Sequence, residues 1–364
     1  MATMMPWMMT PADAQTQWSE FTRKLSLMPR VMEFARKARV GATPTEVVAR
    51  MDQIKLLRYT PSGVAEAKFE TPLLVVFALV NRPYILDLRE GKSVVAHFVS
   101  RGFDTYNLDW GVPTHADRHL DMHAYIERYM DSMVEQVRAR TGSERINILG
   151  YCMGGSMSAI YTALHPEKIK NLMLLAAPVD WSNRDHLLAK WTDASVFDVD
   201  RLIDAYGNMP AEMLQSSFML LKPISNLVEK YITFYENMED EKFLEDFFAM
   251  ETWLNDNIPV AGEMFRQFVK RCMQQNQLIR GELDVDGRPV DLRKITCPVL
   301  NLMAEHDHLV PCGQSRPFND AVGSTDRSTI AFPAGHIGMA VGSRANRELW
   351  PKVCDWLADR SDRL

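Results

Sequence analysis

The chain has 364 residues, of which 46% are hydrophobic and 24% are charged, so it is long and apolar enough to bury a large core. Its formal net charge is -6 at pH 7, and lysine and arginine are not concentrated in any one segment, which argues against nucleic acid as a main partner. One large α/β domain or two smaller domains would both fit this length.

The N-terminal stretch MATMMPWMMTPADAQTQW is apolar and rich in methionine, but it lacks a positively charged segment, and Pro6 and Pro11 interrupt it. This pattern predicts neither a signal peptide nor a membrane span. The cysteines are widely spaced, without a CxxC pair or the spacing of metal ligands: Cys152, Cys272, Cys297, Cys312 and Cys354. We therefore expect a cytoplasmic protein without a disulfide framework, a metal ion or a cofactor.

Residues 1–50 are predicted to be an N-terminal helical segment, with Thr43-Pro44-Thr45-Glu46 as the cap and first turn of a helix. A strand is expected at 55–59, and short apolar runs bounded by turn residues follow at 73–80, 103–110, 146–150, 171–177, 298–305 and 328–334. Helical patterns separate most of these runs. This alternation predicts a mostly parallel sheet with helices on both faces.

The alternation stops near residue 181 and resumes near residue 291. The stretch between them, residues 182–290, has a helical pattern rich in Phe, Met and Leu. We interpret it as a cap subdomain inserted into a core formed by residues 51–181 and 291–364. The alternative is an ordinary helical connection that packs on the core without a role over the site.

The stretch Gly150-Tyr151-Cys152-Met153-Gly154-Gly155 follows the G-x-S-x-G pattern with cysteine in place of serine. A nucleophile elbow of the α/β-hydrolase fold holds its nucleophile in a strained conformation between a strand and a helix, so it needs small residues two positions before and after. The N-terminus of the following helix would also favour the thiolate. The pattern predicts Cys152 as the nucleophile of an α/β-hydrolase fold. The alternative is a buried structural cysteine beside a glycine-rich turn.

In this fold an acid and then a histidine follow the nucleophile along the chain. Asp307, in MAEHDHLVP, and His336, in FPAGHIG, each come just after an expected strand. They would lie at the carboxyl ends of strands, where open α/β sheets build their sites. The order predicts Asp307 as the acid and His336 as the base, although His306 and His308 flank the aspartate and compete with this assignment.

Two backbone N–H groups must stabilise the oxyanion of an acyl-transfer reaction. Met153, directly after the nucleophile, is expected to supply the first. The loop ALVNRPY after a core strand is expected to supply the second, with Val80 as the donor.

Two other patterns in the sequence resemble metal-binding sites, but both favour a different interpretation. His115, His119 and His123 are spaced by four residues, but three ligands in a line along one helix cannot surround a tetrahedral ion, so a solvated face is favoured. The stretch DVDGRPVD at 284–291 lacks the ligand spacing and the terminal glutamate of a calcium loop, and its Asp-Gly pair predicts a hairpin turn.

Six separated motifs stand in one order along the chain, at 78–88 (ALVNRPYILDL), 106–113 (YNLDWGVP), 150–155, 253–263 (WLNDNIPVAGE), 307–311 (DHLVP) and 335–338 (GHIG). Together they resemble the catalytic subunit of polyhydroxyalkanoate synthases, from about residue 40 to the C-terminus. The resemblance implies Cys152 as the nucleophile, His336 as its base and Asp307 as the third catalytic residue. It also implies an auxiliary role for His308.

The same resemblance implies a short-chain 3-hydroxyacyl-CoA substrate, a growing polyester chain and association with polyester storage granules in the cytoplasm. The length of the chain resembles the classes that work with a second, smaller subunit, and a homodimer is also expected. Tyr151 and Met153 look like class IV enzymes, whereas ITCPVLN, DHLVP and AFPAGHIG look like class III, so both types of partner subunit stay open.

Cysteine suits this chemistry because acyl transfer from a coenzyme A thioester to a thiol gives another thioester, which keeps the chain activated for attack by the next hydroxyl. A serine would give a less reactive oxoester. Two alternatives remain: a thioesterase or polyester depolymerase with the same triad, in which water takes the acyl group, and an inactive homologue that only scaffolds storage granules.

Overall fold

The computed structural model describes residues 10–60 and 67–364. The first nine residues of the Met-rich N-terminus, for which no membrane span is predicted, lie outside the described residues. The chain forms two compact units. The smaller unit contains the described residues up to Val40 together with Lys222–Asn255, and the larger contains Gly41–Leu221 and Asp256–Leu364.

The larger unit is built on one sheet of eight strands in the order β1-β2-β6-β3-β7-β8-β11-β12. From β6 to β12 the neighbouring strands are parallel, whereas β1 and β2 add an antiparallel edge. The strands are β1 (Thr45–Met51), β2 (Ile54–Tyr59), β3 (Leu73–Val76), β6 (Thr105–Asp109), β7 (Ile146–Tyr151), β8 (Ile169–Leu175), β11 (Val299–Ala304) and β12 (Arg327–Phe332). The predicted strands from 55–59 onward are confirmed.

The predicted helix that begins at Thr43 is wrong, because Thr45–Met51 forms strand β1. This strand pairs with β2 across a tight turn at Asp52 and Gln53, with Met51 opposite Ile54. The capping motif is a local preference of about 1 kcal/mol. The backbone pairing with β2 outweighs it and also suits the β-branched Val47 and Val48.

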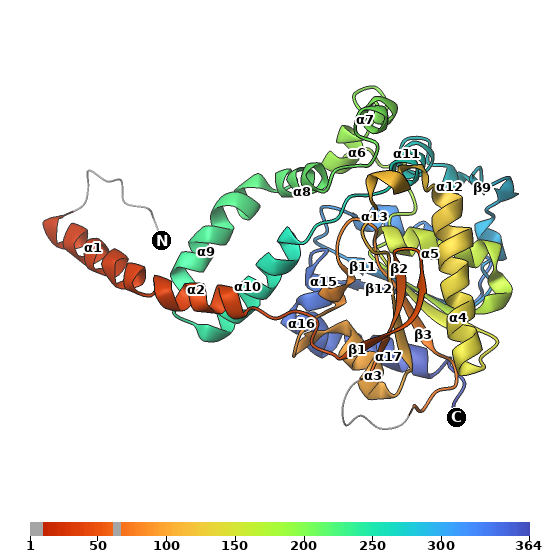
Figure 1. Cartoon of the computed structure of the whole chain (residues 1–364), viewed down its shortest axis with the longest axis horizontal. Helices are drawn as coiled ribbons and strands as arrows, with labels where there is room; N and C mark the ends of the chain where they lie inside the picture. The colour runs from red at the N-terminus through yellow and green to blue at the C-terminus, as the bar shows by residue number, and fades with distance from the viewer. Residues whose placement is uncertain (1–9, 61–66) are drawn as a thin grey trace. The chain divides into compact units, whose positions relative to one another are not determined.

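Helices cover both faces of this sheet (Figure 1). Helix α5 packs on β7 and β8, whereas α3 packs on β6 and against α17. The helices of this unit are α3 (Val94–Arg101), α4 (Asp131–Thr141), α5 (Met153–Leu164), α6 (Leu187–Trp191), α7 (Val199–Tyr206), α8 (Ala211–Leu220), α11 (Gly262–Gln267), α12 (Gln277–Arg280), α13 (Cys312–Ser315), α14 (Phe318–Ala321), α15 (Gly338–Val341), α16 (Ser343–Glu348) and α17 (Trp350–Ala358).

The core of the larger unit lies around its central parallel strands. Every residue of β3, β7 and β11 is buried, as are the residues of α5 from Met153 to Ala163. Parallel strands covered on both faces have continuous apolar sequences rather than alternating ones. The helix that follows Cys152 is therefore held rigidly inside the protein.

The stretch 182–290 is mainly helical, as its pattern predicts, but it is divided between the two units. Residues 222–255 belong to the smaller unit and the rest to the larger. The predicted Asp-Gly hairpin is confirmed, because β9 (Asp284–Val285) pairs with β10 (Arg288–Pro289). Asp286 and Gly287 at its turn have φ of 49° and 78°, the conformation that this pair of residues favours.

The smaller unit joins the N-terminal helices to the middle of the chain. It contains α1 (Pro11–Ser26), α2 (Met28–Lys37), the short π-helix η6 (Ser225–Glu229), α9 (Lys230–Asn237) and α10 (Glu241–Asn255). Thr10 and Asp13 form a capping box at the start of α1. Val31, Met238 and Leu244 form its small apolar core, and the Lys24 ammonium donates to the carbonyl of Tyr235.

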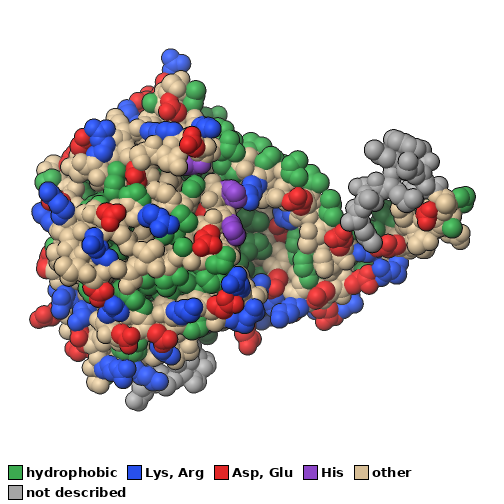
Figure 2. Space-filling model, turned by 180° about the vertical axis from the view of Figure 1, so that it is seen from behind, with side chains coloured by type: hydrophobic (Ala, Val, Ile, Leu, Met, Phe, Trp, Pro, Cys, Tyr) green, Lys and Arg blue, Asp and Glu red, His purple; other side chains and the backbone are tan. Residues whose placement is uncertain are grey.

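Within residues 10–60 and 67–364, no helix is both long and apolar enough to cross a bilayer. On the face drawn in Figure 2, basic and acidic side chains are interspersed. This face therefore shows no extended surface of one charge.

Candidate active site

Cys152 lies at the sharp turn between β7 and α5. Its φ of 54° and ψ of −128° are unusual for a residue with a side chain. The Cys152 N–H donates to the Leu175 carbonyl at 2.9 Å, and the Gly155 N–H donates to the Cys152 carbonyl at 2.9 Å. These bonds from the neighbouring strand and the next helix hold the strained backbone in place, as a nucleophile elbow requires.

The glycines of the motif are required by close backbone contacts. A Cβ atom at Gly150 would lie 2.6 Å from the Gly155 Cα, and one at Gly155 would lie 2.5 Å from the Ala177 Cβ. At Gly154 a Cβ would lie 2.5 Å from the Phe77 carbonyl oxygen. Strand β7, helix α5 and the loop after β3 can therefore meet at Cys152 only if these positions have no side chain.

Asp307 and His336 meet although 29 positions separate them along the chain. His336 Nδ1 lies 2.6 Å from Asp307 Oδ2. The other carboxylate oxygen, Oδ1, accepts from the N–H groups of Leu309 and Val310, both at 2.8 Å. Since the Asp307 side chain is fully buried, these bonds fix its orientation and that of the imidazole.

His336 also interacts with the side chain of Cys152. Burial lowers the pKa of His336, but the negative charges of Cys152 and Asp307 and the hydrogen bond to Asp307 outweigh it and raise the pKa to about 10. The raised pKa makes His336 a strong acceptor for the proton of a neighbouring group. A cysteine, a histidine and an aspartate thus lie in the relative positions of a catalytic triad.

Tyr151 is a part of this arrangement that the sequence motifs did not reveal. Its hydroxyl donates to the His336 carbonyl oxygen at 3.1 Å. Its ring stacks on the His336 ring with 5.0 Å between centroids and an interplanar angle of 23°. Tyr151 occupies a variable position of the G-x-S-x-G pattern, so the pattern alone assigns it no function.

The two expected oxyanion donors lie on the two segments that meet beside Cys152. Met153 is the first residue of α5, where a backbone N–H has no carbonyl of its own helix to bond. Val80 lies in the turn after β3. Asn81 holds this turn, because its Oδ1 accepts from the Arg82 N–H at 2.7 Å and its Nδ2 donates to Asn257 at 3.1 Å.

The other histidines considered for the site are exposed at the surface. His306 and His308 flank Asp307 but are exposed. His115, His119 and His123 are also exposed, and no group of three or more His, Cys, Asp or Glu side chains within the described residues could hold a metal ion.

The remaining cysteines differ from Cys152 in their surroundings. All five cysteines have free thiols. Burial raises the pKa of Cys272, Cys297 and Cys354 to about 12, which disfavours their thiolates. Burial also raises the pKa of Cys312, whose thiol donates to the Ala304 carbonyl at 3.3 Å.

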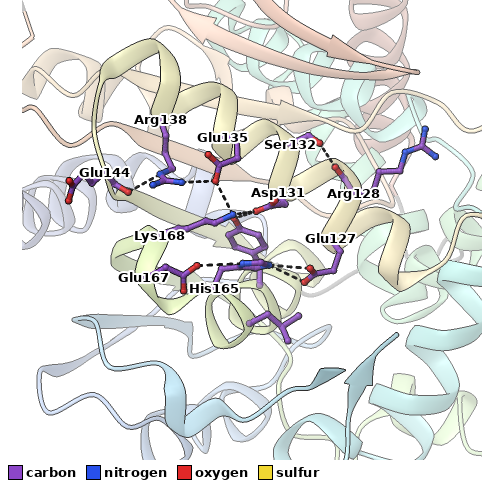
Figure 3. Close-up of polar contacts among 12 residues, drawn as sticks. Glu127, Arg128, Asp131, Ser132, Glu135, Arg138, Glu144, His165, Glu167 and Lys168 are labelled. Atoms are coloured by element: carbon purple, nitrogen blue, oxygen red, sulfur yellow. Dashed lines mark hydrogen bonds and ion pairs between the residues drawn. The ribbon is translucent and has the colours of Figure 1, made fainter. Parts of the chain in front are cut away.

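A network of charged side chains lies at the far end of α5 (Figure 3). Lys168, in the short helix η5 (Pro166–Lys168), lies 2.5 Å from Asp131 and 2.8 Å from Glu135 of α4. His165, directly after α5, lies 3.1 Å from Glu127. These contacts join the end of α5 to α4 and to the segment before α4, so they support the helix that begins at the nucleophile.

Comparison with known proteins shows the family to which the chain belongs. The alpha/beta hydrolase fold family matches residues 85–343, and the poly-beta-hydroxybutyrate polymerase (PhaC) N-terminus matches residues 25–98. The poly(3-hydroxyalkanoate) polymerase subunit PhaC of Allochromatium vinosum is 39% identical over 358 residues, which cover 98% of this chain and 100% of that protein. The chain belongs to the poly(3-hydroxyalkanoate) polymerase family. The subunit PhaC of Haloarcula marismortui is 46% identical over 335 residues, 91% of this chain and 70% of that protein.

Solved structures place this polymerase among proteins of the predicted fold. A predicted lipase from Sulfolobus solfataricus has a TM-score of 0.57 at 16% identity, over 86% of this chain and 93% of that one. MGS-M2, an alpha/beta hydrolase enzyme from a deep-sea metagenome, has a TM-score of 0.51 at 13% identity, over 86% of this chain and 97% of that one. At these identities the likeness confirms the α/β-hydrolase fold and nothing more.

Proposed function

We propose that this member of the polymerase family extends a poly(3-hydroxyalkanoate) chain through an acyl-enzyme on Cys152. The substrate is a short-chain 3-hydroxyacyl-CoA. The observation that carries the proposal is the contact of His336 with both Cys152 and Asp307, with the cysteine at the strained turn between β7 and α5. A thiol at this position gives a thioester acyl-enzyme that remains reactive toward the next hydroxyl.

In the first step His336 takes the proton of Cys152, and the thiolate attacks the thioester carbonyl of the substrate. The N–H groups of Met153 and Val80 stabilise the oxyanion. The bond from the carbonyl carbon to the coenzyme A sulfur breaks, and His336 returns the proton to that sulfur. The hydroxyl of a second hydroxyacyl group then attacks the carbonyl carbon of the acyl-enzyme and gives its proton to the imidazole, which Asp307 holds in place. The bond from that carbon to the Cys152 sulfur breaks, His336 returns the proton to this sulfur, and the two hydroxyacyl units are joined by an ester bond.

The main alternative is hydrolysis, in which water replaces the attacking hydroxyl. The same triad would serve that reaction, but the resemblance to polymerases extends well beyond it. The interactions of His336 with Asp307 and Cys152 support an active enzyme over an inactive protein that only scaffolds granules. His308 is exposed beside Asp307 and is retained in the proposal as an auxiliary residue.

The proposal includes a partner chain. The relatives of Allochromatium vinosum and Haloarcula marismortui are both named as polymerase subunits, which supports a second, smaller subunit for this protein as well. A homodimer and association with polyester granules in the cytoplasm are also part of the proposal. Residues 182–290 are proposed to act as a cap that keeps bulk water from the thioester and moves when substrate or the partner binds.

Incubation with 3-hydroxybutyryl-CoA tests the reaction, with release of coenzyme A and the ratio of polymer to free 3-hydroxybutyrate as readouts. Cys152→Ala is expected to abolish both release and polymer without changing the melting temperature. Cys312→Ala is the matched control, since Cys312 begins helix α13 directly after the loop that holds Asp307, and this variant should keep nearly full activity. Polymer formation by Cys152→Ala would disprove the acyl-enzyme, and free acid as the sole product would favour hydrolysis.

A further inference from the structure

Tyr151 contacts two of the loops that surround the nucleophile. On one side its ring and hydroxyl contact His336, in the loop after β12. On the other side its ring lies 5.4 Å from the ring of Phe77, which directly follows β3 and leads into the turn of Val80. Tyr151 itself is the last residue of β7 and is only 1% exposed. It therefore fills the space between the histidine loop and the loop of the expected oxyanion donor.

The hydroxyl of Tyr151 can make its hydrogen bond at every working pH. Burial, and then the negative charges of Cys152 and Asp307, raise the pKa of Tyr151 well above its usual value. The group stays protonated, so it donates and the carbonyl of His336 accepts at 3.1 Å. This bond fixes the backbone of His336, whereas Asp307 fixes its ring at Nδ1.

The stacked ring of Tyr151 influences the charge of the His336 imidazole as well as its position. An aromatic face within about 6 Å of a cation attracts it. The ring centroids of Tyr151 and His336 are 5.0 Å apart, so the stacking favours the imidazolium over the neutral ring. An imidazolium at this place in turn favours the thiolate of Cys152.

We propose that Tyr151 is a positioning residue that sets the place and the charge of His336 and so favours the reactive thiolate of Cys152. This inference rests on the proposed roles of Cys152 and His336. It assigns two separable contributions to one side chain. The hydroxyl holds the histidine loop at the distance that proton transfer requires, and the ring favours the ion pair between histidine and cysteine.

Two variants separate these contributions, and a third serves as a control. Tyr151→Phe removes the hydroxyl and keeps the ring, whereas Tyr151→Leu removes both. Tyr161→Phe is the matched control, because Tyr161 is a fully buried tyrosine of α5 whose hydroxyl donates to Asp131 at 2.7 Å, in the network away from the site. Each variant is measured for its melting temperature, its kcat and KM with 3-hydroxybutyryl-CoA, and the pH dependence of Cys152 alkylation by iodoacetamide.

We expect Tyr151→Phe to lower kcat about fivefold with little change in KM, since one hydrogen bond that aligns the base is lost. Tyr151→Leu should in addition move the rise of the alkylation rate to higher pH by about one unit, because the imidazolium that stabilises the thiolate is disfavoured. Tyr161→Phe should change neither kcat nor the alkylation profile, even if its melting temperature falls.

The inference is overturned if Tyr151→Phe and Tyr151→Leu match Tyr161→Phe in kcat and in the alkylation profile. It is also overturned if their loss of activity follows the fall in melting temperature alone, because Tyr151 would then be a packing residue. Failure of the proposed function is a distinct result. In that case Cys152→Ala would keep its activity, whatever the behaviour of the Tyr151 variants.

Discussion

Substitution of Gly154 by alanine should disrupt the nucleophile turn through a steric clash. The added methyl carbon would lie 2.5 Å from the Phe77 carbonyl oxygen and 2.6 Å from the Phe77 carbonyl carbon, and it would also meet the Val76 carbonyl oxygen. Ordinary contacts of this kind are about 3.5–4.0 Å. The overlap of about 1 Å is with the backbone at the end of a central, fully buried strand, so a change of side-chain rotamer cannot relieve it.

Overpacking of a tight interior costs about 1–3 kcal/mol, and a clash with backbone atoms falls at the upper end. For Gly154→Ala we therefore expect about 3 kcal/mol lower free energy of unfolding in urea denaturation. The separation of α5 from β3 should also reduce iodoacetamide labelling of Cys152 by at least about tenfold under native conditions.

Gly313→Ala is the matched control for this experiment. Gly313 lies in the short helix α13, and its added methyl would meet only the Asn183 amide nitrogen, at 3.9 Å. Since alanine favours a helix over glycine by about 1 kcal/mol, this variant should be as stable as the parent protein or slightly more stable. Equal stability and equal labelling of Gly154→Ala and Gly313→Ala would refute the claim that glycine is required beside the nucleophile.

Two other substitutions test the acid of the triad and the support of α5. Asp307→Asn should still accept an acyl group from 3-hydroxybutyryl-CoA but should elongate the polymer poorly. Detection of the trapped acyl-enzyme by mass spectrometry would show this. Equal loss of acylation in Asp307→Asn and His336→Gln would instead reduce Asp307 to a group that only orients the histidine. Lys168→Met should lower the free energy of unfolding by about 2 kcal/mol at pH 7, since it leaves the half-buried Asp131 without its cation. Although burial opposes the effect, Lys168 lowers the pKa of Asp131, so this stabilisation is present above the ordinary pKa of an aspartate and is lost as pH falls through the lowered value. Urea denaturation of Lys168→Met and the parent protein at a series of pH values from 7 downward should therefore give a difference in the free energy of unfolding that shrinks as the pH falls below the ordinary pKa of an aspartate, and a constant difference would contradict this assignment.

Much of this fold is determined by patterns that are local in the sequence. The apolar runs of β3, β7 and β11 are continuous because both faces of these strands are covered, and that pattern is readable without any structure. The glycines around Cys152 also mark the turn in the sequence. Contacts within the strand-turn-helix unit exclude a side chain only at Gly150, whereas Gly154 is constrained by Phe77 and Gly155 by Ala177. The order of the nucleophile, the acid and the histidine along the chain then indicates Asp307 and His336 as partners. In the structure His336 Nδ1 lies 2.6 Å from Asp307 Oδ2.

Features that depend on contacts between distant segments were not predictable in this way. A capping motif at Thr43 indicates a helix, yet β1 forms there because β2 provides a partner for its backbone. The N-terminal helices share a unit with residues 222–255, and no local pattern states which apolar faces will meet.

The place of Tyr151 between Phe77 and His336 depends equally on tertiary structure. The sequence alone determines the type of residue at this variable position of the motif and the turn that follows it. Only the folded sheet decides that the ends of β3, β7 and β12 converge on its ring. The physical reason is that local steric rules act on neighbouring residues, whereas packing and hydrogen bonding between strands act on whatever the topology brings together.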